Sequence, residues 1–321
     1  MKTEHLDYID TAKGIGIILV LIGHIFPRES VDFIYLFHMP LFFFISGYLL
    51  SPKAPDYFTI KKLKSLIVPY VSFLFFILLL NTFISLALEH ITVMETIKLY
   101  IKAIYGGALL KGDFGAYWFV TTLFISIVAL NFLITKLRRK TIILVLLIMY
   151  GLSFINQYYF KDIVFPLGIN ICLQSIPLMY VGYYSRCNPN FLKMLSAIGT
   201  FSLIIFLIYH YSSMRVDFKS TQYGLPVINT LLSIMMIFIT FILSKMLKNN
   251  STLKFIGSAS ITIMFTHQWF HFNLIKLGIN NYYAITLMTL VLSLVCHLLL
   301  TKWPTGSFLF LGKGKQSQNS L

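Results

Sequence analysis

A lysine and a histidine near the N-terminus have the residue types and the spacing of a polar path along one helix. Lys13 and His24 are eleven residues apart in YIDTAKGIGIILVLIGH. At 100° per residue they differ by about 20° around the helix axis and lie about 16 Å apart along it. Asp10 falls about 40° from His24 on the same side. An imidazole titrates near neutral pH, so His24 is the first candidate for a general base.

Two other histidines are predicted to lie at a similar depth. Counting residues from the nearest predicted helix end places His38 at about 22 Å and His267 at about 18–20 Å above the inner boundary. His271 follows His267 by one helical turn. Equal depth does not establish proximity, because the order of the helices is unknown. A lone intramembrane histidine can equally serve as a hydrogen-bonding group between helices.

Two further clusters are candidates for substrate binding. The segment IKKLKSLIVPY carries Lys61, Lys62 and Lys64, which suit a phosphate cradle or an ordinary cluster of inside positive charges. In DFGAYWFVTTLF, Tyr117 and Trp118 suit a binding site or an aromatic belt at the membrane surface.

The composition places all these residues in a membrane protein. Of 321 residues, 57% are hydrophobic and 12% are charged, and the mean hydropathy is +0.79. Such a chain cannot cover itself with polar surface in water, which excludes a soluble enzyme, a DNA-binding module and a disordered regulator. The cysteines are too few and too scattered for a disulfide framework or a metal site, and we expect no metal.

Apolar runs long enough to cross a bilayer recur along the chain. They predict an all-α, polytopic membrane protein with about ten transmembrane helices in one integral membrane domain, residues 1–303. A polar cytoplasmic tail is expected at residues 304–321. The predicted spans are 12–27, 33–51, 65–87, 115–135, 141–159, 163–184, 193–211, 224–244, 255–275 and 282–301.

The distribution of positive charge predicts the orientation. With a cytoplasmic N-terminus, 18 of the 26 Lys and Arg residues fall in inside segments and eight in outside segments. Both termini are therefore expected inside (N-in, C-in). The net charge of +15 then needs no nucleic-acid partner, because it follows from membrane topology.

Five segments together resemble the membrane acyltransferase 3 family, in particular its fucose 4-O-acetylase-like branch. The opening YIDTAKGIGIILVLIGH is similar to the family's motif of a basic residue, a ten-residue spacer and a histidine. FHMPLFFFISGYLL resembles its second-helix signature, and KKLKSLIVPY its basic stretch before Pro-Tyr. AYWFVTTLF and FIGSASITIMFTHQWFH resemble later segments, so the likeness covers about residues 6 to 300.

The resemblance implies an integral O-acetyltransferase of the bacterial cytoplasmic (inner) membrane. Acetyl-CoA would be the acyl donor and a carbohydrate hydroxyl the acceptor. His24 matches the family's catalytic histidine, which would act as a general base or as an acyl relay, and Lys13 matches its basic partner. The family usually has arginine at that position, and lysine lacks the planar fork of a guanidinium.

The remaining candidates receive two roles under this hypothesis. Three lysines would bind the phosphates of acetyl-CoA, and four residues would position the acceptor or the thioester. The phosphate-binding candidates are Lys61, Lys62 and Lys64; the positioning candidates are Asp10, His38, Trp118 and His267.

Several alternatives stay open at this stage. A transporter or flippase of a lipid-linked sugar or small solute would also have about ten helices and buried histidines. A bis-histidine haem protein could use His24 and His38. Capsule, O-antigen, another exopolysaccharide or a lipid-linked precursor all fit as acceptor, and the sequence does not define the acyl group or the oligomeric state.

Overall fold

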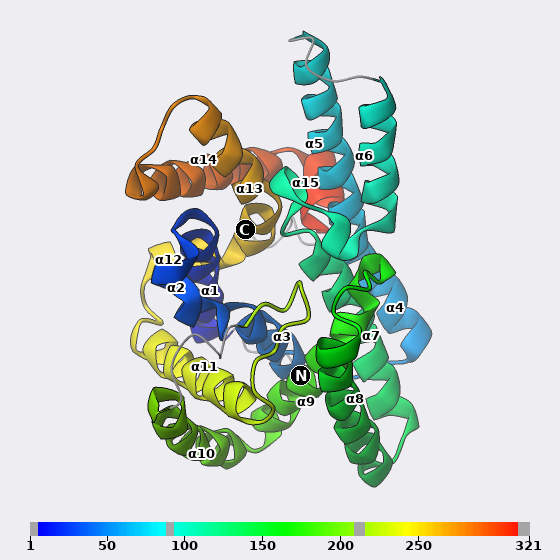
Figure 1. Ribbon diagram of the computed structural model, residues 1–321, viewed down its shortest axis with the longest axis vertical. Helices are drawn as coiled ribbons and strands as arrows, with labels where there is room; N and C mark the ends of the chain where they lie inside the picture. The colour runs from blue at the N-terminus through cyan, green and yellow to red at the C-terminus, as the bar shows by residue number, and fades with distance from the viewer. Residues whose placement is uncertain (1–5, 88–92, 209–215, 314–321) are drawn as a thin grey trace.

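The structure is a computed structural model that describes residues 6–87, 93–208 and 216–313 (Figure 1). Within these residues the regular structure is helical, apart from one isolated bridge between Asp217 and Gln222. The all-α prediction is therefore confirmed.

The first three helices are separated by backbone breaks that lie next to histidines. Helix α1 spans Asp7–Ile25, α2 spans Arg28–Tyr35 and α3 spans His38–Tyr48. Phe26, the residue before Pro27, is extended (φ −80°, ψ 154°), as a residue before proline prefers, and this ends α1. His24 therefore lies in the last turn of α1, and His38 is the first residue of α3.

The next helices form a long antiparallel pair. Helix α4 (Pro55–Lys62) continues through a π-helical turn, Leu63–Ile67, into α5 (Val68–Ala87). Helix α6 (Val93–Tyr105) returns beside α5 (Figure 1). Single π-helical turns within α-helices frequently occur at functional sites, and this one directly follows Lys62.

The remaining helices complete the bundle, with α11 and α13 on either side of α1 (Figure 1). Their bounds are Trp118–Lys136 (α7), Arg139–Tyr159 (α8), Cys172–Cys187 (α9), Pro189–Ile208 (α10), Ile228–Met246 (α11), Ser251–Ser258 (α12), Ser260–Lys276 (α13), Tyr282–Lys302 (α14) and Pro304–Leu311 (α15).

Glycines allow α1 and α12 to pack in direct backbone contact. A side chain at Gly14 would overlap the carbonyl oxygen of Leu253, and one at Gly257 would overlap that of Asp10. Small residues permit this close approach of two helices. The contact holds the Asp10–Lys13 turn of α1 against the start of the segment that leads into α13.

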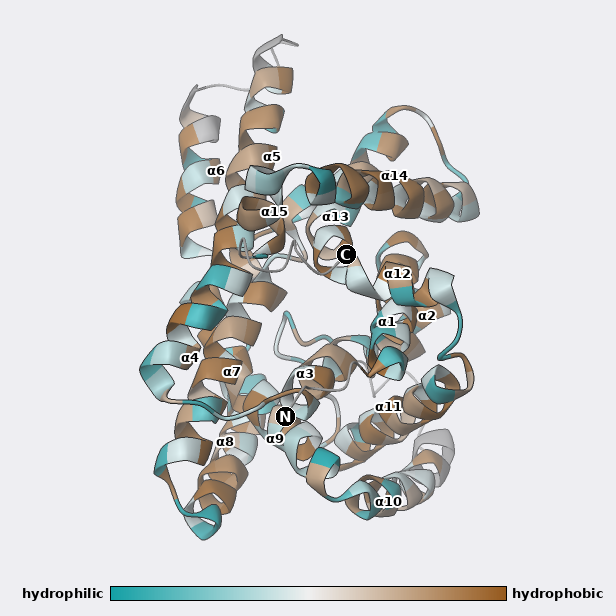
Figure 2. Cartoon of the chain, turned by 180° about the vertical axis from the view of Figure 1, so that it is seen from behind, coloured by the Kyte–Doolittle hydropathy of each residue, from teal (hydrophilic) through white to brown (hydrophobic). Residues whose placement is uncertain are grey.

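Among the residues that the structure describes, seven helical segments are long and apolar enough to cross a membrane. Hydrophobic residues dominate α5, α8, α11 and α14, while hydrophilic residues gather at helix ends and loops (Figure 2). These seven correspond to seven of the ten predicted spans; the described segments are Asp7–Ile25, Arg28–Tyr48, Pro55–Ser85, Gly112–Lys136, Arg139–Tyr159, Ile228–Met246 and Tyr282–Lys302.

Two of the other three predicted spans are interrupted in the structure, and the third extends past the described residues. The predicted span 163–184 contains a 3-10 segment, Pro166–Ile171, before α9, which has 16 residues. The predicted span 255–275 is divided at Ala259 between α12 and α13. The predicted span 193–211 extends beyond the described part of α10. The count of ten is therefore not reproduced.

The predicted polar tail begins with an apolar helix. Residues 304–311 form α15, which packs against α5, and Leu311 is buried. Phe310 of α15 lies edge-on to Phe73 of α5, with 4.9 Å between ring centroids. The helical domain therefore continues through α15, and residues 314–321 of the predicted tail lie outside the described residues.

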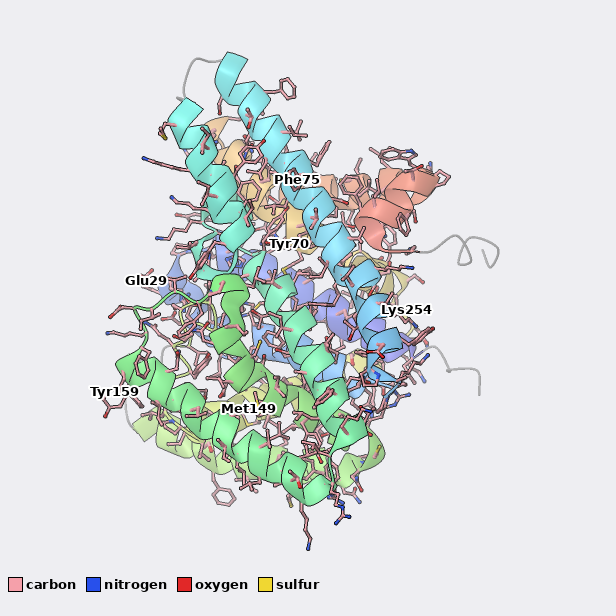
Figure 3. All side chains as sticks on the ribbon, turned by 90° about the vertical axis from the view of Figure 1, so that its right-hand side faces the viewer. Glu29, Tyr70, Phe75, Met149, Tyr159 and Lys254 are labelled. Carbon is pink, nitrogen blue, oxygen red and sulfur yellow. The ribbon has the colours of Figure 1, made fainter. Side chains whose placement is uncertain are left out.

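Residues predicted to lie on opposite membrane surfaces lie on opposite sides of the molecule. In Figure 3, Glu29 and Tyr159 lie at one side and Lys254 at the other. Glu29 belongs to a predicted outside segment, Tyr159 is the outer end of the predicted span 141–159, and Lys254 belongs to an inside segment. This separation is consistent with the predicted topology, whereas which side faces the cytoplasm stays a prediction.

Candidate active site

Three histidines from α1, α3 and α13 meet in the interior. The ring centroid of His24 lies 5.3 Å from that of His267 and 6.5 Å from that of His38. His38 and His267 are buried, at 2% and 0% exposure, whereas His24 is partly accessible. The tertiary structure thus brings together three residues for which the sequence predicted only similar depth.

Backbone carbonyls determine the tautomers of two of these rings. Nδ1 of His38 lies 2.8 Å from the carbonyl oxygen of Ile34, and Nδ1 of His267 lies 2.8 Å from that of Ile263. A carbonyl oxygen only accepts, so Nδ1 must donate in both rings. In the neutral rings, Nε2 is therefore a hydrogen-bond acceptor.

His24 opens onto a cavity of about 220 Å³, which we call the histidine cavity. His38 and Trp118 also line it, whereas His267 and His271 do not. The aromatic-belt alternative does not fit Trp118 or Tyr117, because the side chains are 4% and 0% exposed inside the protein. The complete lining is His24, Arg28, Tyr35, His38, Met39, Lys111, Gly112, Gly115, Ala116, Trp118, Asp217, Phe218, Lys219, Met264, Gln268 and Phe272.

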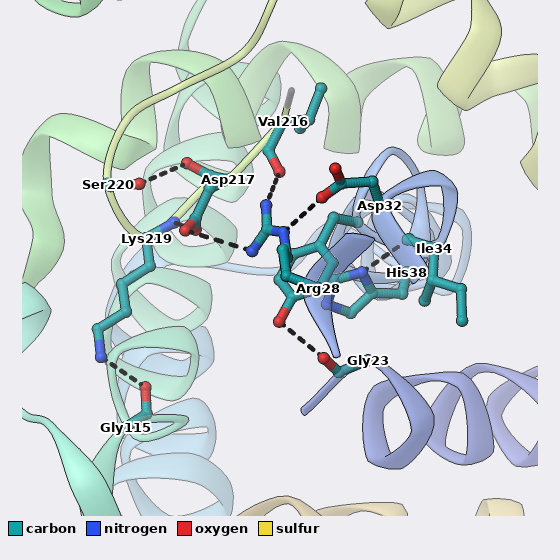
Figure 4. A network of polar contacts seen from close by, with 11 residues as sticks. Gly23, Arg28, Asp32, Ile34, His38, Gly115, Val216, Asp217, Lys219 and Ser220 are labelled. Carbon is teal, nitrogen blue, oxygen red and sulfur yellow. Dashed lines mark hydrogen bonds and ion pairs between the residues drawn. The ribbon is translucent and has the colours of Figure 1, made fainter. Parts of the chain in front are cut away.

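A network around Arg28 forms one wall of the histidine cavity (Figure 4). Arg28 donates through Nε to Asp32 (2.7 Å) and through Nη2 to the carbonyl oxygen of Val216 (2.8 Å). Its guanidinium carbon lies 3.3 Å from the ring centroid of Tyr35, an arrangement that suits a cation–π interaction. Tyr35 in turn donates to the carbonyl oxygen of Gly23, beside His24 (2.8 Å). The network therefore ties α2 and segment 216–227 to the end of α1.

A lysine from the same segment also lines the histidine cavity. Lys219 donates through Nζ to the carbonyl oxygens of Leu110 (2.5 Å) and Gly115 (3.0 Å). Its backbone N–H donates to Asp217 (3.1 Å). Burial is the main cause that lowers the pKa of Lys219 to about 8; Asp217 raises this pKa and the Lys111 charge lowers it.

A second cavity, of about 260 Å³, lies beside Lys13 and Lys62, and we call it the lysine cavity. Lys13 donates to Asp10 at 3.0 Å, so Asp10 orients this lysine and does not line either cavity. Lys61 and Lys64 are exposed and do not line this cavity either. Its lining is Lys13, Phe42, Ile45, Ser46, Leu49, Lys62, Leu66, Phe119, Val120, Leu123, Ser260, Ile261 and Met264.

Met264 belongs to the walls of both cavities. It lies on α13, one turn before His267, and is 4% exposed. The two cavities therefore approach each other at this flexible side chain, with Lys13 and Lys62 on one side and His24 on the other.

Comparison with known families matches residues 6–302 to the family described as "Acyltransferase domain". The chain belongs to the acyltransferase 3 family. The protein is accordingly a membrane acyltransferase, which favours an enzyme over the transporter and haem alternatives. No curated protein and no solved structure matches the acyltransferase significantly.

Several site residues were not singled out from the sequence. Arg28 entered only the charge count, and Asp217 and Lys219 lie in a loop far along the chain. Gln268 offered a usable signal, because it is a polar residue at predicted membrane depth next to His267. Its Oε1 atom is buried without a hydrogen-bond partner among the described residues, although the side chain lines the histidine cavity.

Proposed function

We propose that this acyltransferase transfers an acetyl group from cytoplasmic acetyl-CoA to a carbohydrate hydroxyl at the bacterial cytoplasmic membrane. The observation that carries the proposal is the pair of cavities on either side of Met264. One contains the accessible imidazole of His24, and the other contains Lys13 and Lys62.

The lysine cavity suits the donor. Its volume of about 260 Å³ is small for a drug-sized ligand pocket, so it fits a slender pantetheine arm better than a nucleotide. Lys13 and Lys62 would attract the phosphates near the mouth of the cavity, where Lys61 and Lys64 add positive charge outside. The thioester would reach His24 when the Met264 side chain changes rotamer.

The histidine cavity suits the acceptor hydroxyl. His24 would remove the hydroxyl proton while the oxygen attacks the thioester carbonyl carbon. The C–S bond then breaks, and the thiolate takes the proton from His24, which leaves free CoA and an acetyl ester. His24 ends the reaction neutral, so the step balances without another reactant.

The neighbouring side chains suit different supporting roles, because some offer hydrogen-bond acceptors and others offer donors. The free Nε2 atoms of neutral His38 and His267 are acceptors. That of His38, in the cavity wall, suits a hydroxyl, and that of His267, outside the cavity, suits a protonated His24. The developing oxyanion needs donors instead. The amide group of Gln268 and the indole N–H of Trp118 are donors of this kind in the cavity wall.

Acetyl transfer in proteoliposomes tests the proposal. Purified protein would receive radiolabelled acetyl-CoA and a bacterial surface polysaccharide that has been chemically deacetylated. We expect ester-linked label on the glycan with the wild type and none with His24→Ala. His271→Ala is the matched control, because His271 lies on α13 and lines neither cavity.

Substantial transfer by a well-folded His24→Ala protein would reject His24 as base. Label that stays on the protein in the absence of acceptor, and that requires His24, would instead assign His24 as a covalent acyl carrier. Movement of unmodified sugar without any ester formation would contradict transferase chemistry.

A further inference from the structure

Positive charge exceeds negative charge at the histidine cavity. Among its described lining residues, Arg28, Lys111 and Lys219 are cationic, and Asp217 is the carboxylate. Asp32 lies outside the lining and pairs with Arg28 at 2.7 Å. Two carboxylates therefore face three cations, which leaves an excess of one positive charge beside the acceptor site.

The arrangement of contacts assigns this excess to the two lysines. Asp217 lies 3.8 Å from Nη1 of Arg28, and its other oxygen accepts the backbone N–H of Lys219. Arg28 therefore has both carboxylates beside its guanidinium, and Figure 4 shows the group enclosed by these partners. Arg28 and Asp217 together serve as a structural tie between α2 and segment 216–227.

Lys219 has its ammonium group turned away from Asp217, toward Gly115 (Figure 4). The two oxygens that it contacts are uncharged carbonyls, and an ammonium group has three donors, so one N–H is available. Lys111 is exposed and forms no ion pair within the described part of the chain. Two ammonium groups thus line one cavity, and no carboxylate of a described residue is bound to either nitrogen.

Like charges held together in a partly buried site repel each other, and a bound anion removes this repulsion. The influence of Lys111 on the Lys219 pKa indicates that the two charges interact. A neutral sugar would gain nothing from this pair, since hydroxyl groups need only ordinary donors and acceptors. A carboxylate or phosphate would form charge-assisted hydrogen bonds with both lysines.

We infer that Lys111 and Lys219 bind an anionic group of the acceptor, either a uronate carboxylate or a phosphate on the sugar. The inference rests on the proposed function, because it assigns the chemical class of the acceptor in the same cavity. An anion held at these lysines would leave a neighbouring hydroxyl of the same glycan facing His24. Trp118, also in the wall, offers an aromatic surface for a sugar ring.

Calorimetric titration of the purified protein in nanodiscs tests the inference without catalysis. Tetragalacturonate would be compared with its methyl ester, which has the same sugars without the charge. Galactose 1-phosphate would be compared with galactose in the same way. We expect at least one charged ligand to bind about tenfold or more tightly than its neutral counterpart, and the better one identifies carboxylate or phosphate as the preferred anion.

The test variant reverses the charge of Lys111, because its exposed side chain forms no ion pair with any described residue. Lys111→Glu is expected to abolish the preference for the charged ligand. Lys161→Glu is the matched control, since Lys161 is an exposed lysine in another predicted outside loop and does not line the cavity. It is expected to retain the preference.

Three results would overturn the inference: equal affinity for charged and neutral ligands, no binding of either at millimolar concentration, or an unchanged preference in Lys111→Glu. The His24→Ala protein is expected to bind the anion like the wild type. Anion binding without any acetyl transfer would therefore reject the proposed function alone, and transfer to neutral glycans without anion preference would reject this inference alone.

Discussion

The imidazole rings of His24 and His267 lie 5.3 Å apart, centroid to centroid, and are tilted by 33°. Nδ1 of His267 donates to Ile263, and Nε2 has no hydrogen-bond partner among the described residues. A lone pair is therefore available beside His24 when that ring becomes protonated. In the proposed reaction, His267 would stabilise the imidazolium form of His24 without contacting the substrate.

This relationship predicts that His267→Asn lowers kcat about 100-fold while KM for acetyl-CoA stays within about twofold. Asparagine retains a short amide that can donate to Ile263 and removes the Nε2 acceptor. The pH at which kcat reaches half its maximum is expected to shift, because the proton affinity of His24 changes. His271→Asn, one turn away, is expected to alter none of these values; a loss in kcat without a change in the pH profile would indicate a structural role.

Met264 is predicted to control passage between the two cavities. Met264→Trp should block the thioester and reduce acetyl transfer at least tenfold, because a larger rigid ring replaces a flexible side chain. Met264→Ala should keep transfer and increase acetyl-CoA hydrolysis in the absence of acceptor. Both rates can be measured by CoA release in proteoliposomes.

Met194→Trp is the control for this pair, since Met194 is 52% exposed on α10. Normal transfer by Met264→Trp would show that the donor reaches His24 by another route.

The lysines should separate into two groups in donor binding. Lys62→Gln is expected to raise KM for acetyl-CoA about tenfold, which corresponds to the loss of one charge-assisted hydrogen bond. Lys61→Gln and Lys64→Gln should each have a smaller effect that disappears at high salt, because both side chains are exposed. Steady-state kinetics at two ionic strengths distinguish the groups. Equal effects of all three substitutions would reject the proposal that Lys62 binds acetyl-CoA inside the lysine cavity.

The affinity for an anionic acceptor should depend on pH through Lys219. Burial lowers its pKa to about 8, with Asp217 and Lys111 as the charged neighbours that shift it. Below this pH the ammonium form predominates, and above it the charge is lost. Binding of tetragalacturonate is therefore expected to weaken between pH 7 and pH 9, while binding of its methyl ester stays constant. A flat profile for the charged ligand would exclude Lys219 as its partner.

Backbone contact between α3 and α9 should make Gly47 critical for stability. A Cβ atom at Gly47 would overlap the backbone of Met179, so Gly47→Ala is expected to destabilise the fold by about 1–3 kcal/mol. Gly151→Ala is the matched control, because no described atom beyond its own helix backbone lies within 4 Å of its Cβ position and alanine favours the helix. Thermal unfolding in detergent measures both; an unchanged Tm for Gly47→Ala would mean that α3 and α9 separate readily.

The amino-acid sequence by itself determined the helical class, most of the membrane spans and the central candidate, His24. These features depend on local composition and on periodicity along one helix, which the order of residues contains directly. The depth argument also placed His38 and His267 at a level similar to that of His24, since position along a helix axis follows from counting residues.

Only the tertiary structure decided which helices meet and where they break. The contact of His24 with His267, the division at Ala259 and the packing of α15 depend on interactions between distant segments. The same holds for Lys219, whose side chain donates hydrogen bonds to the distant carbonyl oxygens of Leu110 and Gly115. Periodicity describes the direction of a side chain from its own helix axis, but it carries no information about the neighbour that will occupy that direction.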